Sequence, residues 1–476
     1  MIWNKYSVLL PLALMFLILA CNRSGSEVIR IDNPPENGVF SLQNTILKIS
    51  QINFDSASYI DDIGYQRIDF EKLKTLKQKT AIKEYKAIEI ENKFIKLTLI
   101  PDRGKPYSFI YKVTGNEEFF IPEIAQIQGS PNKTGWWFLM GGAEYNMPDE
   151  EHGETWAVPW SWEVIENSPR KKSVMMSVNE LRYGLKESVT ISVYPDKAFY
   201  EAHISITNPT DSTIKFQHWI NPMWVPGGDR NGLTPNTEFI IPTKDVYVTE
   251  RTFNNWMLSY SPDSNRLQPW EENPMRFFRN WKNSGDLLAW KVEKGFYSAF
   301  SHEKSEGIVR VFPVDINPGC NIWTFGFEPE IRRRVNFSGS ETHNGYVEMW
   351  GGITQGFNNY YSLGPGETLS WTEWMYPYLN TGGLHYADQD FAATFFDKEN
   401  NNYEVSLCPS GDVKGLELKV ISSGTHKSYL FIVLRSAFPK KSIKGFSFIS
   451  DKEDLELIIS RRGEEIIRLK PRKTAF

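Results

Sequence analysis

The segment at residues 141–153, GGAEYNMPDEEHG, concentrates side chains that can do chemistry. If the segment is extended, Glu144 and Asn146 point to the same side, because side chains alternate along a strand. A carboxylate and an amide on one side can hydrogen-bond sugar hydroxyls, and His152 adds a third polar group. The two glycines at the start allow close approach of the backbone to a ligand. We therefore predict that this segment forms one wall of a carbohydrate site.

The acidic run Asp149, Glu150 and Glu151 raises the question of a metal ion. Calcium takes about six to eight oxygen ligands, but consecutive residues of an extended chain point in alternating directions. The run lacks the i, i+2, i+4 spacing of a calcium loop, and the chain has no His-x-His or His-Glu-x-x-His pattern for zinc. The spacing predicts a solvated acidic turn, and we expect no metal and no cofactor.

Tryptophans gather around the same segment, at positions 136, 137, 156, 160 and 162. Glycine and proline lie between them and favour loops over strand interiors. Loops at the face of a sandwich carry function more often than core strands do. Trp136 and Trp137 would there stack on the apolar faces of sugar rings. The alternative is that the cluster packs beneath a long loop.

The elements that must position these residues are strands. Apolar and polar residues alternate with period two in many short runs, of which residues 86–101 and 187–220 are the clearest. The best helix candidate is short, at residues 70–78, and no repeat of fixed period stands out. So many strands exceed one immunoglobulin-sized sandwich and lack the blade repeat of a propeller. We therefore predict an all-β fold built on a very large two-sheet sandwich.

A second, smaller β domain is predicted at the C-terminus. Glycine and polar residues interrupt the pattern at residues 380–390, and the rest of the chain alternates again. We predict the large sandwich at residues 30–380 and an immunoglobulin-like β-sandwich at residues 390–476. Cys320 and Cys408 could form a disulfide in an oxidising compartment, but two free buried thiols are favoured.

The N-terminus indicates export. Lys5 precedes an apolar run at residues 8–20 that is too short to span a bilayer, which is typical of a signal peptide at residues 1–20. The run ends in LILAC, which resembles a bacterial lipobox and implies lipidation of Cys21 at the head of a tether, residues 21–29. Asn22 stands where an inner-membrane retention aspartate would be, so the resemblance implies an outer-membrane lipoprotein, on the periplasmic side or at the cell surface. The alternative is a soluble secreted protein.

The composition is that of a packed globular protein, with 41% hydrophobic and 23% charged residues. The formal net charge is −5, and no basic patch argues for nucleic acid as a partner. Aromatic residues make up 14% of the chain, which suits a sugar-binding surface and a large β core equally well. Composition does not predict the oligomeric state.

Seven segments between about residues 86 and 378 carry a family resemblance when they are taken in order. They are IENKFIKLTLIPDRG, GGAEYNMP, VYPDKAFYEAHISITNPT, FQHWINPMW, SHEKSEGIVRVFP with PGCNIWTFG, YVEMWGG and LGPGETLSWTEWMYPY. On these segments the chain resembles an uncharacterised bacterial family of galactose-mutarotase-like proteins, whose fold is the large β-supersandwich of aldose 1-epimerases. The resemblance implies this fold and a carbohydrate ligand. It says less about the reaction, because a fold does not fix a function.

The resemblance also implies a catalytic pair. True mutarotases have an acid histidine on an inner strand and a base glutamate late in the sandwich, and the matching positions are His218 and Glu348. Such a pair would protonate the ring oxygen and deprotonate the anomeric hydroxyl. His218 replaces the tryptophan usual in the family, and the alternative is that it is a hydrogen-bonded inner-sheet residue and Glu348 a strand-edge carboxylate. The predicted substrate-binding residues are Arg103, Trp136, Trp137, Glu144, Asn146, His152, Asn221 and Trp350.

Other functions stay open. Glycoside hydrolysis would need two carboxylates at a defined separation, and the candidates are Glu144, Glu154, Glu348 and Glu373. A lyase would need cations to neutralise a uronate, for which Arg103, Lys105 and Arg230 are available. Some supersandwich glycan enzymes use calcium, so the resemblance keeps Ca²⁺ as the alternative to no cofactor. A protein without catalysis would be a glycan-binding or a structural envelope lipoprotein.

Overall fold

The computed structural model describes residues 28–32, 38–77, 79–129, 133–150, 152–248, 267–282, 284–327, 344–356, 359–437, 439, 443–450 and 454–474. These residues are organised in β-sheets, with one α-helix among them, α1 (Phe70–Thr75). Asp69 caps α1, since its side chain accepts a hydrogen bond from the amide of Lys72. The helix predicted at residues 70–78 is thus confirmed, although it ends at Thr75. Within the described ranges, no helix is long and apolar enough to cross a membrane.

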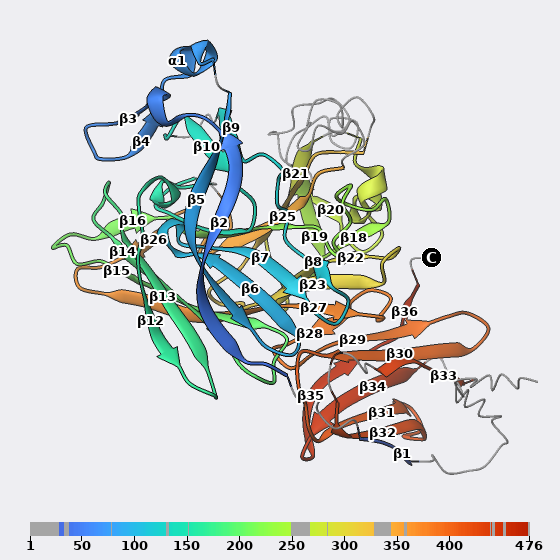
Figure 1. The fold of residues 1–476 in the computed structure, drawn as a ribbon. Helices are drawn as coiled ribbons and strands as arrows, with labels where there is room; N and C mark the ends of the chain where they lie inside the picture. Colours follow the sequence, from blue (N-terminus) through green and yellow to red (C-terminus); the bar gives the residue numbers. More distant parts are fainter. Residues whose placement is uncertain are drawn as a thin grey trace, which may run out of the picture.

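Two large sheets form the body of the molecule (Figure 1). The seven-stranded sheet has the order β11 (Ala143–Asn146), β17 (Trp219–Trp224), β25 (Val347–Gly352), β24 (Cys320–Thr324), β21 (Gly285–Ala289), β19 (Asp245–Val248) and β20 (Leu267–Pro269). The eight-stranded sheet has the order β12 (Ser161–Asn167), β13 (Lys172–Asn179), β14 (Lys186–Val193), β15 (Tyr200–Thr207), β27 (Thr368–Leu379), β23 (Glu306–Val311), β22 (Phe296–Ser301) and β18 (Thr237–Ile240).

The two large sheets pack against each other around a buried core. Arg310 of β23 crosses this layer, because its Nη1 donates to the carbonyl oxygens of Ile220 in β17, at 3.3 Å, and Gly351 in β25, at 3.2 Å. Its Nε and Nη2 bind both oxygens of Glu373 in β27, at 2.5 and 2.8 Å. A buried guanidinium needs such a bidentate partner. Glu373 is therefore engaged in the core, which does not suit the hydrolytic role left open for it.

A third sheet and several short strands complete the large unit. The five-stranded sheet has the order β2 (Ser41–Ile52), β5 (Thr80–Glu91), β6 (Ile95–Ile100), β7 (Lys105–Tyr111) and β8 (Asn116–Glu117). Strand β7 packs beside β11, and β2 and β5 run on to the end of the molecule that carries α1 (Figure 1). Short two-stranded pairs are formed by β3 (Ser58–Ile60) with β4 (Gln66–Ile68), β9 (Gln126–Gly129) with β10 (Trp136–Leu139), and β16 (Ile214–Phe216) with β26 (Tyr361–Leu363).

The C-terminal part is a second β-sandwich with its own hydrophobic core. One sheet has the order β1 (Val28–Asp32), β32 (Ser428–Ser436), β31 (Leu416–Ser422), β34 (Leu455–Arg461) and β35 (Glu464–Leu469). The other has the order β28 (Tyr386–Ala387), β29 (Phe391–Asp397), β30 (Asn402–Pro409) and β33 (Ile443–Ile449), and β36 (Arg472–Lys473) also pairs with β29. The predicted fold class, an all-β supersandwich followed by a small sandwich, is confirmed.

The first strand does not belong to the large sandwich. Residues 28–32 form β1, which pairs in parallel with β32 at the edge of the C-terminal sheet (Figure 1). The sequence predicts that the large sandwich begins at about residue 30, whereas the first strand of its sheets is β2. Strand β1 joins the C-terminal sandwich because its side chains Ile29 and Ile31 pack against the core of that sandwich. A strand's partner depends on contacts far away in sequence, which alternation alone does not reveal.

Candidate functional site

A row of side chains crosses one face of the seven-stranded sheet. Glu144 of β11 pairs with Asn221 of β17, which falls opposite Trp350 of β25 in the register of those strands. Trp350 in turn pairs with Asn321 of β24. Since paired residues point to the same face, these four side chains lie side by side. They are 4%, 0%, 1% and 3% exposed respectively, so the row is buried.

Two further predicted residues lie on the same face. Asn146 pairs with Trp219, one step along the strands from the row. Glu348 lies on the other side of the row, and its Oε2 accepts a hydrogen bond from Asn221 Nδ2 at 3.2 Å. Carboxyl groups, amides and tryptophans therefore alternate over a compact area of three strands. Side chains of this kind are typical of ligand pockets, in which a few polar groups fix the orientation of the ligand.

Lys105 holds the carboxylate of Glu144 from the neighbouring sheet. Its Nζ lies 3.1 Å from Glu144 Oε1, and both side chains are buried. Burial by itself would raise the pKa of Glu144, but the charge of Lys105 and the approach of His152 outweigh it and lower the pKa to about 2. Burial lowers the pKa of Lys105, and Glu144 only partly offsets this. Glu144 is thus a permanent carboxylate at neutral pH.

Trp137 and His152 cover the outer side of Glu144. The indole Nε1 of Trp137 donates to Glu144 Oε2 at 3.3 Å, and His152 Nδ1 lies 3.7 Å from the same oxygen. The two rings are stacked, with centroids 4.2 Å apart and planes 14° apart. A cavity of about 20 Å³, which has room for about one water, borders Glu144, Asn146 and Lys105.

The two glycines before β11 serve the fold and not a ligand. Gly141 and Gly142 both have positive φ angles, of 89° and 80°. A Cβ on Gly142 would lie 2.3 Å from the carbonyl oxygen of Pro106, and one on Gly141 would lie 2.2 Å from that of Phe120. The predicted close approach therefore exists, but it is made to the neighbouring sheet. It brings Lys105 within reach of Glu144.

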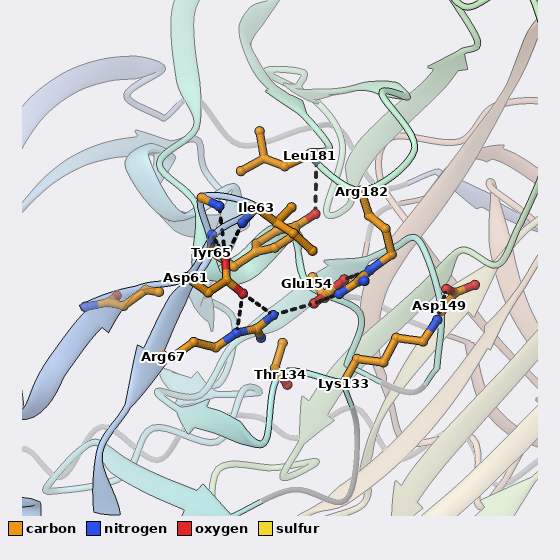
Figure 2. A network of polar contacts seen from close by, with 12 residues as sticks. Asp61, Ile63, Tyr65, Arg67, Lys133, Thr134, Asp149, Glu154, Leu181 and Arg182 are labelled. Atoms are coloured by element: carbon orange, nitrogen blue, oxygen red, sulfur yellow. Dashed lines mark hydrogen bonds and ion pairs between the residues drawn. The ribbon is translucent and has the colours of Figure 1, made fainter.

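A network of charges anchors the loop that carries His152 (Figure 2). Arg67 Nη2, at 3.1 Å from Oε1, and Arg182 Nε, at 2.5 Å from Oε2, approach the carboxylate of Glu154 from two sides. Asp149, at the other end of the loop, pairs with Lys133 Nζ at 2.5 Å and accepts a hydrogen bond from the Tyr183 hydroxyl at 2.8 Å. Each end of the loop is thus tied to other segments.

This network corrects the prediction of a solvated acidic turn. Asp149 and Glu154 are buried, because arginine, lysine and tyrosine side chains surround them. Glu150 is half-buried: its amide donates to Gln217 Oε1, and its carboxylate accepts a hydrogen bond from the amide of Lys133. Glu151 lies outside the described residues. Within the described part of the chain, no three His, Cys, Asp or Glu residues gather in a way that could hold a metal ion.

A comparison with known protein families shows to which family this chain belongs. Residues 65–378 match the family described as "Domain of unknown function (DUF5107)". The chain belongs to this family. The matched DUF5107 region contains every residue of the row and ends before the C-terminal sandwich.

Solved structures share the fold of the DUF5107 region at low sequence identity. A TPR-domain containing protein from Parabacteroides distasonis is 18% identical, with a TM-score of 0.57, and the match covers 74% of this chain but 56% of that one. A galactose mutarotase-like protein from Lactobacillus casei is 10% identical, with a TM-score of 0.41, over 61% of this chain and 100% of that one. A galactose mutarotase related enzyme from Lactobacillus acidophilus is 14% identical, with a TM-score of 0.41, over 61% and 97%.

In the DUF5107 region, His218 and Glu348 do not come together. The carbonyl of His218 accepts a hydrogen bond from the amide of Ile353, whereas Glu348 pairs with Met223. The two residues therefore lie at opposite ends of the β17–β25 pair. They also lie on opposite faces, since positions 348 and 353 are five residues apart in sequence, which is an odd step along a strand.

The surroundings of His218 are those of a core residue. Its Nε2 lies 2.7 Å from Oε1 of Glu187 in β14, and neither side chain is exposed. Its ring packs edge-on against Trp371 of β27, with centroids 5.3 Å apart. His218 thus lies between the two large sheets, where a sugar has no access. This placement matches the alternative of a hydrogen-bonded inner-sheet residue.

The remaining candidates lie around the row and not in it. Trp136 donates its indole N–H to the carbonyl of Gln66 at 2.9 Å and packs against Trp156, with ring centroids 4.7 Å apart. Arg103 borders the cavity at Glu144 and reaches the carbonyl of Trp156 at 3.5 Å. Arg230 is exposed in a loop after β17. Most of the tryptophan cluster therefore packs inside the fold. Trp137 hydrogen-bonds the row through Glu144, and Trp156 borders the same cavity as Glu144.

Sequence reasoning missed Asn321, which extends the row onto β24. Its segment, PGCNIWTFG, is part of the resemblance, but only the strand register places it beside Trp350. The prediction of two free buried thiols is confirmed, since Cys320 and Cys408 are both buried and form no disulfide. Cys21 lies outside the described residues.

Proposed function

We propose that this protein binds carbohydrate on the face of the seven-stranded sheet that carries Glu144, Asn221 and Trp350, and that it serves glycan processing. The observation that carries the proposal is the row itself, in which a carboxylate, an amide and a tryptophan lie on neighbouring strands. Carboxylates and amides hydrogen-bond sugar hydroxyls, and an indole covers the apolar face of a sugar ring.

The charges of the site favour a neutral sugar. Glu144 and Glu348 bring two carboxyl groups to this face. Two cations border the cavity beside Glu144: Lys105 is paired with Glu144, and Arg103 donates to the carbonyl of Trp156. An anionic sugar would be repelled by Glu144 in a region of low dielectric constant. This argues against the uronate lyase, whose third candidate cation, Arg230, is exposed outside the row.

The state of Glu144 suits binding more than proton transfer. Its pKa of about 2 keeps it ionised, so it accepts hydrogen bonds and does not act as an acid near neutral pH. Glu348 is then the candidate base if the protein turns its sugar over, and binding without turnover is the alternative. Because the row is buried, a ligand must select a locally opened form of the protein.

Glycan binding tests this proposal directly. On an array that contains neutral and acidic glycans, the parent protein should bind neutral ones. Asn221→Ala should weaken binding about tenfold or more, since it removes one hydrogen-bonding group from the centre of the row. Asn179→Ala, at an exposed position of β13 in the other large sheet, is the matched control and should leave the affinity unchanged.

Two results would contradict the proposal: no glycan bound by the parent, or equal affinities for Asn221→Ala and Asn179→Ala. Circular dichroism of each variant checks that it is folded. Product analysis of any bound glycan then separates catalysis from binding. If the protein is an enzyme, Glu348→Gln should lose turnover while it still binds.

We also propose that the protein is lipidated at Cys21 and anchored in the outer membrane. The support is the LILAC sequence, together with Asn22 at the position that governs sorting. In a Gram-negative host that is fed radioactive palmitate, the parent should be labelled and Cys21→Ser should not. Labelling of Cys21→Ser to the level of the parent would contradict the proposal.

A further inference from the structure

The row of the proposed sugar site continues beyond Asn321. Asn321 pairs with Leu288 of β21, and Leu288 pairs with Tyr247 of β19. The complete row therefore runs from Glu144 to Tyr247 over six neighbouring strands. Its character changes along the way, from charged and polar side chains on β11 and β17 to apolar and aromatic ones on β21 and β19.

An exposed indole stands at the far end of the row. Trp290 directly follows β21 and is 39% exposed. Its ring packs edge-on against Tyr247, with centroids 6.1 Å apart and planes at 68°. A Cβ on Gly356 would contact Trp290 Cζ3 at 3.4 Å and Leu288 Cδ2 at 3.7 Å, so these residues form one packed group. The indole is thus supported from the side of the row and open to solvent elsewhere.

The length of the row exceeds one sugar ring. Neighbouring strands lie about 4.8 Å apart, so five steps from β11 to β19 span about 24 Å. The four residues from Glu144 to Asn321 are at most 4% exposed, whereas Trp290 at the far end is 39% exposed. A ligand that lies along the row would therefore have one end in the polar interior and the other at the molecular surface.

We propose that the site takes an oligosaccharide, with a chain end at Glu144 and a later ring stacked on Trp290 beside Tyr247. This inference rests on the proposed carbohydrate function. The polar end supplies hydrogen bonds for the hydroxyl-rich terminus, whereas the aromatic end offers an apolar platform that fits the flat face of a ring. The uncharged aromatic end also fits a neutral chain.

Affinity as a function of chain length tests this inference. The probes are neutral gluco-, manno- and galacto-oligosaccharides, each from the monosaccharide to the hexasaccharide, titrated calorimetrically into the parent protein. For the series that binds, affinity should rise about tenfold or more between the shortest and the longest members. Trp290→Ala should lose that gain and keep the affinity for the monosaccharide. Tyr59→Ala is the matched control, an exposed aromatic residue on β3, outside the large sheets.

The outcomes separate the two proposals. If the parent binds a glycan with an affinity that does not depend on chain length, or if Trp290→Ala binds hexasaccharide like the parent, the oligosaccharide inference is overturned and the sugar site stands. If no member of any series and no glycan on the array binds the parent, the proposed function fails and this inference fails with it.

Discussion

Two buried glutamate side chains of this protein have pKa values that are shifted in opposite directions, and the charges of their neighbours cause the difference. Glu144 is buried beside Lys105, whose charge lowers its pKa to about 2 in spite of burial. Glu118 is buried beside Glu306, so burial and the second carboxyl group both raise its pKa well above the ordinary 4.5. The first carboxyl group is fixed as an anion that can accept hydrogen bonds, whereas the second is held as the neutral acid.

The state of Glu118 predicts how stability depends on pH. A carboxyl group whose pKa is raised on folding stabilises the protein below its unfolded pKa, and this contribution is lost as pH rises through the folded pKa. We therefore expect the free energy of unfolding of the parent to fall from pH 5 towards pH 8. Glu118→Gln should remove this loss and gain about 1–3 kcal/mol over the parent at the higher pH, since no buried charge has to form.

Chemical denaturation across this pH range measures the effect. Glu123→Gln, an exposed glutamate in the same segment, is the control and should follow the parent at every pH. The backbone amide of Gly227, which donates to Glu118 Oε2 at 3.2 Å, can also bond the side-chain oxygen of glutamine. A Glu118→Gln curve that runs parallel to that of the parent would show that folding does not raise the pKa of Glu118.

The side of a strand on which neighbouring side chains lie could be predicted from the sequence, but their partners on other strands could not. Alternation correctly placed Glu144 and Asn146 on one side of an extended segment, because the side-chain period of a strand is local. The expected partnership of His218 with Glu348 failed in the structure, since it depends on which face of the seven-stranded sheet each residue occupies. Lys105 was a candidate for binding an anionic ligand, but it forms an ion pair with Glu144.

At the scale of elements, Figure 2 shows the ion pairs and hydrogen bonds that tie Asp149 and Glu154, at the two ends of the loop after β11, to other segments. The loop after β11 contains a run of acidic residues that looks solvated in sequence. Four segments meet there, because Arg67 follows the β3–β4 turn, Lys133 precedes β10, and Arg182 and Tyr183 lie between β13 and β14. Ion pairs with well-formed geometry on both ends of the loop limit its motion and so position His152 over Glu144.

The kind of element was predictable because strand and helix signals are local. The short helix was placed within a few residues, since Asp69 provides a capping side chain directly before it. The tryptophan cluster was ambiguous for a physical reason, because exposed and buried indoles occur in the same glycine-rich and proline-rich context. Hydrogen bonds of Trp136 to Gln66 and of Trp160 to Thr155 show that those two indoles are satisfied inside the fold.

At the scale of the whole molecule, the two ends of the chain meet in one domain. Strand β1 precedes all strands of the large unit, yet it is hydrogen-bonded to β32 of the C-terminal sandwich. If Cys21 is lipidated as proposed, the seven residues from Cys21 to Val28 reach at most about 25 Å. The C-terminal sandwich, which β1 joins, would then lie next to the membrane.

The pairing of β1 gives a prediction about the stability of the C-terminal sandwich. Ile31 packs against its core, whereas Val28 is exposed on the same strand. Ile31→Asp should therefore destabilise the C-terminal sandwich by about 1–3 kcal/mol, because it removes a partly buried apolar side chain and places a charge at the core. Val28→Asp is the control and should change little. Hydrogen exchange of the full chain, read at β32, should speed up in Ile31→Asp alone. Equal exchange in both variants would mean that β1 adds no stability to the sheet it joins.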